Sequence, residues 1–597
     1  MRPMFRASLI AAALSALAPF ALAKTVVAGP GGQVPPHPLI VGHSTISSPG
    51  RYGGTLYEGL GGAPATFNIY GTLNPHTYTV MMHNVLSPLI RENPVTGALE
   101  PGLATSWSSS KGGLKYIIHL RRGVRWSDGA PFSAQDVIFT MRCAEENPAA
   151  QGNNAGAFTI GGKTVAFSSP NPYTVVAKLV KPDGSFLRLL NEVDVIPKHV
   201  LAADCPFYNP KATNAQFNAA WSINTPPKDI VGTGPFELAK YVPGQEVVLR
   251  RNPYSFYAST YGQQLPYANH LTYLIVKSPQ VQVAMFESKQ LSLLGLNASQ
   301  FSTLKAKQVA GAPFQVLLAK NPYPSALAMY FNYNDKHPDL ASLFSKARFR
   351  RAVGEAIDYH RIIDQVFHTL AAKPVGWISP ASVDYSAKYR GDYGKYDPAA
   401  AKKLLASLGL HPGSSGILHF PDGKPVQFTL ITYGHNSSDQ KMGEVVQADL
   451  AKVGIKVNLK LLNFSLLIQQ SFGGNFDASL FGFGSTPNNQ FRQPIWQPGG
   501  SLYFWHLSDR VNKKADPSVM FPWERALYKD FVALDTTTAP AARSALWDKI
   551  QRIYAQEQPA TFLVWPDAAL SAVQSNVGNV FIRGGYLWAA NYALYLK

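Results

Sequence analysis

The sequence predicts an α/β protein with at least two lobes. Its 597 residues exceed the roughly 250–300 residues at which a single hydrophobic core stops growing, so each lobe needs its own core. A helical pattern over residues 440–453 ends at Gly454 and leads directly into a strand pattern over residues 455–461. A buried-strand pattern over residues 477–483 follows, and this alternation of helix and strand is typical of α/β folds.

The composition is that of a folded globular protein. The chain is 46% hydrophobic, 12% aromatic and 15% charged, which excludes disordered and collagen-like classes. Lys and Arg exceed Asp and Glu by 54 − 36 = 18 positive charges. These basic residues are scattered, with no zinc-finger spacing and no aromatic RNA-binding signature, so we expect no nucleic-acid partner. The basic balance favours anionic or neutral ligands.

The first 23 residues have the pattern of a secretory signal peptide. Arg2 and Arg6 precede an apolar run over residues 7–23 that contains Pro19 and ends in the small residues around Ala23. The run is shorter than the roughly 20 residues that a membrane span needs, which disfavours an anchor. We therefore predict cleavage after Ala23 and a periplasmic protein. No cysteine lies near that site, so no lipid anchor is expected.

The next segment is predicted to be irregular. Residues 24–65 are rich in Gly, Pro and Ser, so we expect them to form an exposed leader segment. Ordered structure is expected to start near Thr66. A turn is predicted at residues 74–76, and mixed apolar spacing predicts a helix over residues 80–90.

A strand, a tight turn and a helix are predicted in the region that follows. A glycine turn leads into a strand over residues 114–121, and residues 123–129 form a tight turn. Ser133 and Asp136 have the spacing of a helix N-cap residue and the third residue of the helix that it caps. Phe132 and Val137 are placed to form a hydrophobic staple.

Further along, two short strands are predicted around the Pro243-Gly244 turn. Asp397 and Pro398 begin a helix that Gly409 ends, and a helix over residues 541–556 precedes a strand over residues 561–565. One helical face is defined by Phe349, Ala352, Val353, Ala356 and Ile357, whereas Lys346, Arg350 and Arg351 fall on other faces.

The chain has two cysteines, Cys143 and Cys205. An even pair in an oxidising compartment is consistent with a disulfide. Two unpaired buried thiols are the alternative, and the sequence leaves both open.

Local motifs for catalysis are absent from the sequence. There is no HExxH, CxxC, GxGxxG or P-loop, and the glycine-rich run around Ser485 lacks the GxSxG order of a nucleophile elbow. We therefore expect no metal, no cofactor and no enzymatic activity. Catalytic residues can be distant in sequence and still meet in the folded protein, where a single sequence does not show them. A secreted hydrolase that acts on a peptide or glycan is therefore an alternative.

An ordered series of short sequence blocks runs over residues 66–580. The blocks are Pro101-Gly102-Leu103-Ala104 with Trp107, Leu120-Arg121, Val124-Arg125-Trp126-Ser127-Asp128-Gly129, Asp136-Val137, Gly232-Thr233-Gly234-Pro235-Phe236, Arg251-Asn252-Pro253, Arg350-Arg351-Ala352, Ala356-Ile357-Asp358, Tyr396-Asp397-Pro398, Gly454-Ile455-Lys456-Val457 and Gln558-Pro559-Ala560. Each block alone is weak, and the series together is specific. In this order the blocks resemble the family-5 extracellular solute-binding proteins of ABC transporters, the group of dipeptide-, oligopeptide- and nickel-binding proteins.

The resemblance implies a two-lobed periplasmic binding protein, type II and like the large cluster C members, with a hinge between the lobes. By analogy residues 66–275 form the first lobe, residues 276–500 the second, and residues 501–597 return to the first. The implied function is the capture of a peptide-like or other small organic solute and its delivery to the membrane permease of an ABC importer, by a monomer. A solute-sensing receptor or chaperone is a further alternative.

Peptide-binding members of the family commonly place an acidic residue after the strand that ends the second lobe, where it pairs with the α-amine of the peptide. Residues 481–489 contain no acid here, so a neutral, hydroxyl-rich or amide-bearing ligand suits this loop better. The candidate ligand-binding residues are Ser485, Thr486, Asn488 and Asn489 in the loop and the aromatic residues Tyr78, Trp377, Tyr433, Phe483, Trp496 and Trp505. The identity of the ligand, whether peptide, blocked peptide, sugar or metal complex, stays open.

Overall fold

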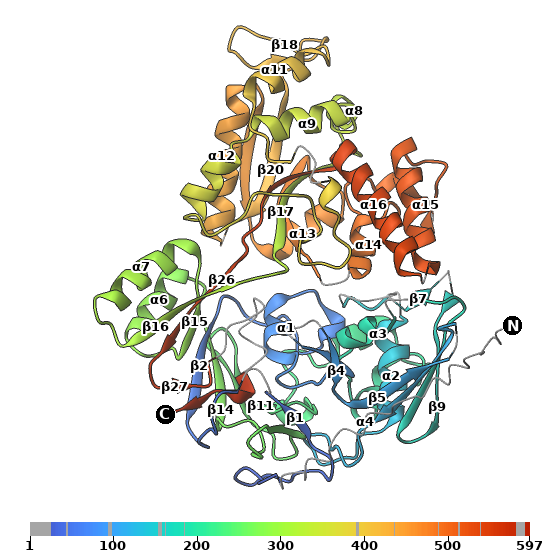
Figure 1. Ribbon diagram of the computed structural model, residues 1–597, viewed down its shortest axis with the longest axis vertical. Helices are drawn as coiled ribbons and strands as arrows, with labels where there is room; N and C mark the ends of the chain where they lie inside the picture. The colour runs from blue at the N-terminus through green and yellow to red at the C-terminus, as the bar shows by residue number, and fades with distance from the viewer. Residues whose placement is uncertain are drawn as a thin grey trace, which may run out of the picture.

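The computed structural model has two lobes, each with its own sheet and hydrophobic core (Figure 1). The larger cores are made by residues between 39 and 293 with a C-terminal contribution, and by residues between 326 and 565. The structure describes residues 26–42, 46–93, 98–110, 112–147, 149–152, 158–160, 163–183, 186–389, 393–434, 436–486, 489–511, 514–537, 539–580 and 591–597. The predicted signal peptide lies outside these ranges.

The first lobe is built on two main sheets. A seven-stranded sheet has the order β11-β12-β14-β2-β15-β26-β16, and a four-stranded antiparallel sheet has the order β5-β6-β10-β9. Their bounds are β2 Thr55–Leu60, β5 Ala104–Ser109, β6 Lys115–Leu120, β9 Ala166–Asn171, β10 Thr174–Lys178, β11 Phe236–Val242, β12 Glu246–Arg251, β14 His270–Ile275, β15 Leu293–Gly295, β16 Phe314–Lys320 and β26 Ala568–Gln574.

Short helices and strand pairs complete this lobe. The helices are α1 Pro75–Met81, α2 Ala134–Thr140, α3 Phe186–Leu189, α4 Lys198–Leu201, α5 Asn214–Ala219, α6 Pro279–Glu287 and α7 Ala298–Val309. The strand pairs are β1 Leu39–Val41 with β13 Tyr257–Ser259, β3 Ile90–Glu92 with β4 Leu99–Pro101, β7 Thr159–Ile160 with β8 Lys163–Thr164, and β27 Val577–Gly578 with β28 Tyr595–Leu596. Helices α6 and α7 lie beside one end of the large sheet with a small core of their own (Figure 1).

The second lobe is built on a five-stranded sheet of order β21-β20-β22-β17-β25. Its strands are β17 Ser325–Phe331, β20 Gln427–Tyr433, β21 Lys456–Leu462, β22 Ala478–Gly484 and β25 Ala560–Val564. Its helices are α8 Pro338–Phe344, α9 Ala347–Ala356, α10 Tyr359–Arg361, α11 Pro398–Ala406, α12 Ser437–Lys452, α13 Phe464–Phe472, α14 Gln493–Trp496, α15 Pro522–Thr536 and α16 Pro540–Glu557. Two further strand pairs are β18 His411–Pro412 with β19 Leu418–His419, and β23 Arg510–Val511 with β24 Lys514–Ala515.

Most of the predicted elements are confirmed. Ser133 caps α2 in a capping box with Asp136, and the turn at residues 243–244 joins β11 to β12. Asp397 caps α11, and the predicted apolar face of α9 is buried. Helix α12 leads into β21 as the sequence predicts, and α16 leads into β25.

The helix predicted over residues 80–90 is wrong. The helix in this region is α1, which begins earlier because the side chain of Asn74 accepts hydrogen bonds from the backbone N–H groups of His76 and Thr77, and Pro75 occupies the first turn. The backbone of Met82 is then extended, with ψ of 131°, which ends the helix, and His83 follows with a left-handed φ of 60°.

Ordered structure begins before the expected start at Thr66. Strand β1 pairs in parallel with β13, and β2 lies between β14 and β15 inside the seven-stranded sheet. The Leu56 side chain in β2 is fully buried. The Gly- and Pro-rich composition of residues 24–65 therefore conceals a strand of the central sheet.

The chain also returns to the first lobe later than the expected boundary at residue 501. Tyr503, Phe504 and Trp505 are buried in the second core, and β25 pairs with β17 in the second sheet. The return comes at β26, which pairs with β15 and β16 of the first lobe.

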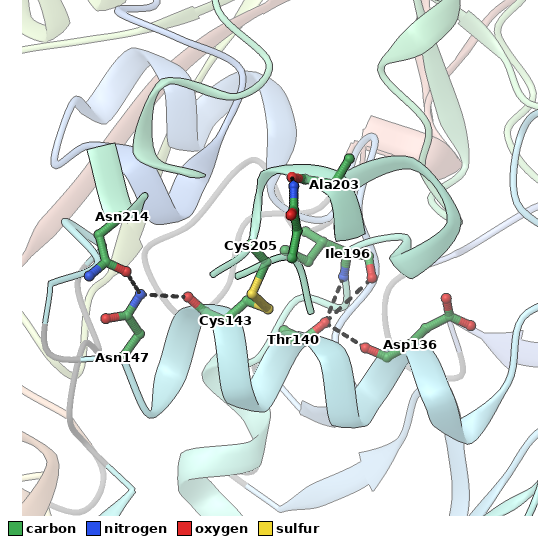
Figure 2. The surroundings of a disulfide bond; sticks show 9 residues. Asp136, Thr140, Cys143, Asn147, Ile196, Ala203, Cys205 and Asn214 are labelled. Atoms are coloured by element: carbon green, nitrogen blue, oxygen red, sulfur yellow. Dashed lines mark hydrogen bonds between the residues drawn. A yellow bond between two sulfur atoms is a disulfide. The ribbon is translucent and has the colours of Figure 1, made fainter. Parts of the chain in front are cut away.

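Cys143 and Cys205 are joined by a disulfide in the first lobe, with Cα atoms 5.9 Å apart (Figure 2). The adjacent Asn147 side chain donates hydrogen bonds to the carbonyl of Cys143 and to the side chain of Asn214. Thr140, one turn before Cys143, accepts a hydrogen bond from the backbone N–H of Ile196. The disulfide and these bonds hold residues 196–214, which include α4, against α2 and the turn that follows it.

Across the described part of the chain, every helix is too short or too polar to cross a membrane.

Candidate ligand-binding site

Two chain crossings connect the lobes, and they lie side by side. Strands β16 and β26 are paired in the first sheet, while β17 and β25, which adjoin them in sequence, are paired in the second sheet. Between these pairs the backbone N–H of Asn321 donates to the carbonyl of Asp567 at 2.6 Å. The lobes therefore meet at the start of β17.

The loop after β22 begins at this crossing. Gly484, the last residue of β22, is paired with Ser325, the first residue of β17. The backbone N–H of Ser485 then donates to the carbonyl of Pro324 within the crossing. The loop in which the sequence lacks an acid is thus positioned at the boundary between the lobes.

The predicted polar residues of this loop bond mainly to the protein itself. The Ser485 hydroxyl accepts from the backbone N–H of Ser379 at 3.0 Å and donates to Oδ1 of Asn489 at 3.3 Å. Nδ2 of Asn489 donates to the Ser382 hydroxyl at 2.7 Å and to the Thr486 carbonyl at 3.2 Å. Ser485 and Asn489 are buried, so they hold the loop in shape. Asn488 lies outside the described residues.

A carboxyl group absent from the loop sequence is supplied to it by Asp384. Its Oδ2 accepts the backbone N–H of Asn489, and its side chain is buried. Burial raises the pKa of Asp384 to about 6, although the Asn489 N–H, Arg543 and Arg188 each lower it. No local pattern marks Asp384, because it lies 105 positions before its partner Asn489.

Arg188 belongs to the first lobe, so its field at Asp384 shows that the two lobes face each other here. Arg188 in α3 forms an ion pair with Glu92 of β3 at 2.9 Å. The same two side chains also affect the pKa of Tyr323, which lies in the crossing segment between β16 and β17. Burial is the main cause that raises this pKa, Glu92 raises it further, and Arg188 lowers it. Figure 1 shows α3 on the side of the first lobe that faces α14 of the second.

A second electrostatic contact links the lobes through Asp535 of α15. Burial raises its pKa to about 6, hydrogen bonds from Gln493 and Gln490 lower it, and Asp183 of the first lobe raises it. The segment from Asn489 to Gln493 therefore lies on the same boundary as Asp384.

The predicted aromatic residues divide into two groups. Trp377, Trp496 and Trp505 are 2%, 1% and 0% exposed and belong to the second core. Trp377 stacks on Trp496 with ring centroids 4.9 Å apart. Phe483 is partly buried and packs edge to face on Trp496. Of the predicted aromatic residues, it is the one that lies at the end of β22.

Tyr78 and Tyr433 lie apart from that cluster. The Tyr78 hydroxyl, on α1 of the first lobe, donates to the carbonyl of Thr72 at 2.7 Å. Tyr433 ends β20 and packs edge to face on Phe464 at 5.8 Å. Both rings are partly buried.

Within the described ranges, no three His, Cys, Asp or Glu side chains gather as a metal-binding group. His506 lies 2.8 Å from Glu524, which also accepts the hydroxyl of Tyr503. All three are buried, and Glu524 completes the first turn of α15, so this trio serves the second core.

The family is decided by the match of residues 98–501 to the bacterial extracellular solute-binding proteins, family 5. The chain belongs to this family. A probable ABC transporter-binding protein of Deinococcus radiodurans is 29% identical over 520 residues, which cover 82% of this chain and 84% of that protein.

Two solved structures are also similar to this chain in fold. The oligopeptide-binding protein AppA of Bacillus subtilis, in complex with a nonapeptide, has a TM-score of 0.76 at 22% identity, covering 92% of this chain and 100% of that one. The periplasmic binding protein MelB of Agrobacterium fabrum C58, in complex with stachyose, has a TM-score of 0.78 at 22% identity, covering 94% and 88%. The two-lobed fold is shared with both.

Proposed function

We propose that this family-5 solute-binding protein is the periplasmic substrate-binding component of an ABC importer. It captures a peptide-like or other small organic solute between its lobes, delivers the solute to the membrane permease, and performs no chemistry. The observation that supports this most strongly is the pair of adjacent crossings, held together by the Asn321 to Asp567 hydrogen bond, beside a boundary lined with groups from both lobes.

Two adjacent crossings form a hinge. Because β16, β17, β25 and β26 run through the same narrow connection, rotation of one lobe changes few contacts there. A ligand that contacts both lobes stabilises the closed state by its differential affinity for that state. The closed surface is then the form that the permease recognises.

The proposed ligand class is a small organic solute without a free ammonium at the β22 loop. The relatives AppA and MelB were solved with a nonapeptide and with stachyose, so this fold accommodates both chemistries. In this chain the loop has no acid of its own, and Asp384 already accepts the Asn489 N–H. An ammonium group there would compete for a carboxyl whose pKa burial has raised.

A secreted hydrolase is the less favoured alternative. The one His–carboxylate pair that is buried among the described ion pairs is His506 with Glu524, and it lies in the second core. A hydrolase needs its base beside a substrate, whereas these side chains are 4% and 0% exposed.

The test is ligand-dependent closure of the purified mature protein. Thermal unfolding and small-angle X-ray scattering are measured with a nonapeptide, its N-acetylated form and stachyose. A bound ligand raises the melting temperature by mass action and lowers the radius of gyration as the lobes close. A ligand that raises the melting temperature without any change in scattering contradicts the hinge mechanism, and turnover of the ligand contradicts the absence of chemistry.

A further inference from the structure

We infer that Arg492 is a ligand-recognition residue whose guanidinium binds a carboxylate group of the solute. This inference rests on the proposed function, since it assigns the chemistry of the solute bound at the same boundary. It concerns a residue that no local motif in the sequence marks.

Arg492 lies in the segment that meets the first lobe. It ends the single helical turn Asn489–Arg492 and directly precedes α14. Its neighbour Gln490 donates to Asp535 at 3.4 Å and accepts from Arg543 at 2.7 Å. The side chains of Gln490 and Gln493, on either side of Arg492, both bond to Asp535, and Asp183 of the first lobe also acts on Asp535. The residues that flank Arg492 therefore lie at the inter-lobe boundary.

The guanidinium of Arg492 extends to the end of β22. A Cβ atom placed on Gly484 would stand 3.6 Å from Nη2 of Arg492 and 3.8 Å from the hydroxyl of Ser325. Gly484 and Ser325 are the paired residues where the second sheet meets the crossing. The cation therefore lies beside the loop at which peptide-binding members of the family commonly place an anion.

Arg492 has a buried donor without a partner. Its Nε is enclosed, yet among the described residues this nitrogen has no hydrogen-bond acceptor and the side chain forms no ion pair. Arg543 nearby, by contrast, donates to two backbone carbonyls and to Gln490. An enclosed guanidinium N–H is costly to leave unpaired, so the missing acceptor is expected from a ligand.

A carboxylate is the ligand group that fits this donor. The guanidinium presents its N–H groups in a planar fork that matches the two oxygens of a carboxylate. Asp384 and Asp535 accept hydrogen bonds from Asn489 and Gln490, and neither forms an ion pair with Arg492 among the described residues. The polarity of this site is thus opposite to that of a pocket that receives an ammonium group.

The experiment observes the Arg492 side chain directly in the wild-type chain. Arginine is labelled with ¹⁵N, and the Nε–Hε resonance of Arg492 is assigned from its loss in Arg492→Lys, with Arg348→Lys on the exposed face of α9 as the matched control. Sodium acetate is then titrated, with sodium chloride at equal ionic strength and acetamide as the neutral isostere.

We expect a saturable shift of the Arg492 resonance with acetate, at least threefold larger than that with chloride or acetamide, and no such shift for Arg348. A resonance that does not move with acetate, or that moves equally with all three probes, overturns the inference. This readout does not depend on lobe closure. If a solute closes the lobes but acetate does not shift the Arg492 resonance, this inference is rejected and the proposed function stands. If acetate shifts the resonance but no solute closes the lobes, the carboxylate site at Arg492 stands and the proposed function is rejected.

Discussion

The backbone N–H of Asn489 donates a hydrogen bond to Oδ2 of Asp384 at 2.5 Å, across 105 positions of sequence. This bond joins the loop after β22 to the segment of residues 379–386, which also contacts the loop through Ser379 and Ser382. The loop at the lobe boundary is therefore held by a second segment of the same lobe, and its conformation depends on both.

The first prediction concerns the Asn489 side chain. Asn489→Ala removes its bonds to Ser382, Ser485 and Thr486 and leaves buried partners unpaired, so we expect the free energy of unfolding to fall by about 1–3 kcal/mol. Urea denaturation followed by tryptophan fluorescence measures this loss. Asn458→Ala, the same change at an exposed position of β21, is the control. Equal stabilities for the two variants would contradict the assigned role of Asn489.

Local structure was predictable where one segment contains its own stop and start signals. Ser133 with Asp136 and Asp397 with Pro398 satisfy helix N–H groups a few residues away, so these starts were read correctly. Asn74 uses the same chemistry to begin α1, but its Asn-Pro pair also fits a turn, and the following apolar residues suggested a later helix.

The site was predictable only in part, because its contacts join distant segments. The sequence correctly placed the end of β22 and the absence of an acid in its loop. It could not show that Asp384 bonds to Asn489, or that Arg188 faces the second lobe, since each contact depends on the packing of whole lobes. Trp377 and Trp496 do contact each other, but within the hydrophobic core. The sequence could not distinguish the two locations, since an aromatic residue in a core and one in a binding site give the same pattern.

The second prediction concerns the disulfide between Cys143 and Cys205. The bond closes a loop of 62 residues, so replacing both cysteines by serine is expected to lower the free energy of unfolding by about 4 kcal/mol on the chain-entropy model. Urea denaturation of the double variant measures the change. The wild-type chain in a thiol reductant serves as a chemical control and should approach the variant. A reductant that leaves the stability unchanged would show that the bond does not form in solution.

The third prediction concerns Arg350, which the helical pattern placed away from the apolar face of α9. Its side chain is fully buried and donates to the carbonyls of Phe344, Glu557 and Gln558. Arg350→Lys retains the charge, but its donors all lie on one nitrogen, whereas the guanidinium reaches the three carbonyls from Nη1, Nη2 and Nε. We therefore expect a loss of at least about 2 kcal/mol in the free energy of unfolding.

Arg348→Lys, on the exposed face of the same helix, is the matched control and should change the unfolding free energy by less than about 0.5 kcal/mol. Calorimetric melting of both variants provides the comparison. A stable Arg350→Lys protein would mean that the buried guanidinium contributes little beyond its charge.

The fourth prediction concerns the buried carboxyl of Glu145 in the first lobe. Burial raises the pKa of Glu145 to about 8, the Tyr70 hydroxyl lowers it, and Glu192 and Asp194 raise it further. In the unfolded chain this carboxyl titrates near its ordinary value of about 4.3. Between these two values the folded protein holds a proton that the unfolded chain has lost, so stability from this group is present at low pH and is lost as pH rises toward 8.

Glu145→Gln keeps the shape of the side chain and removes its titration. Because one pKa unit corresponds to about 1.4 kcal/mol, the difference between the folded and unfolded pKa values predicts that the wild-type chain loses on the order of 5 kcal/mol more stability than Glu145→Gln between about pH 4 and pH 9. Urea denaturation at intervals of one pH unit measures the two profiles, and Glu444→Gln on the exposed face of α12 controls for the loss of one carboxylate. Parallel profiles for the wild type and Glu145→Gln would show that Glu145 is ionised in the folded protein, which requires a cation or water beside it that offsets the cost of its burial.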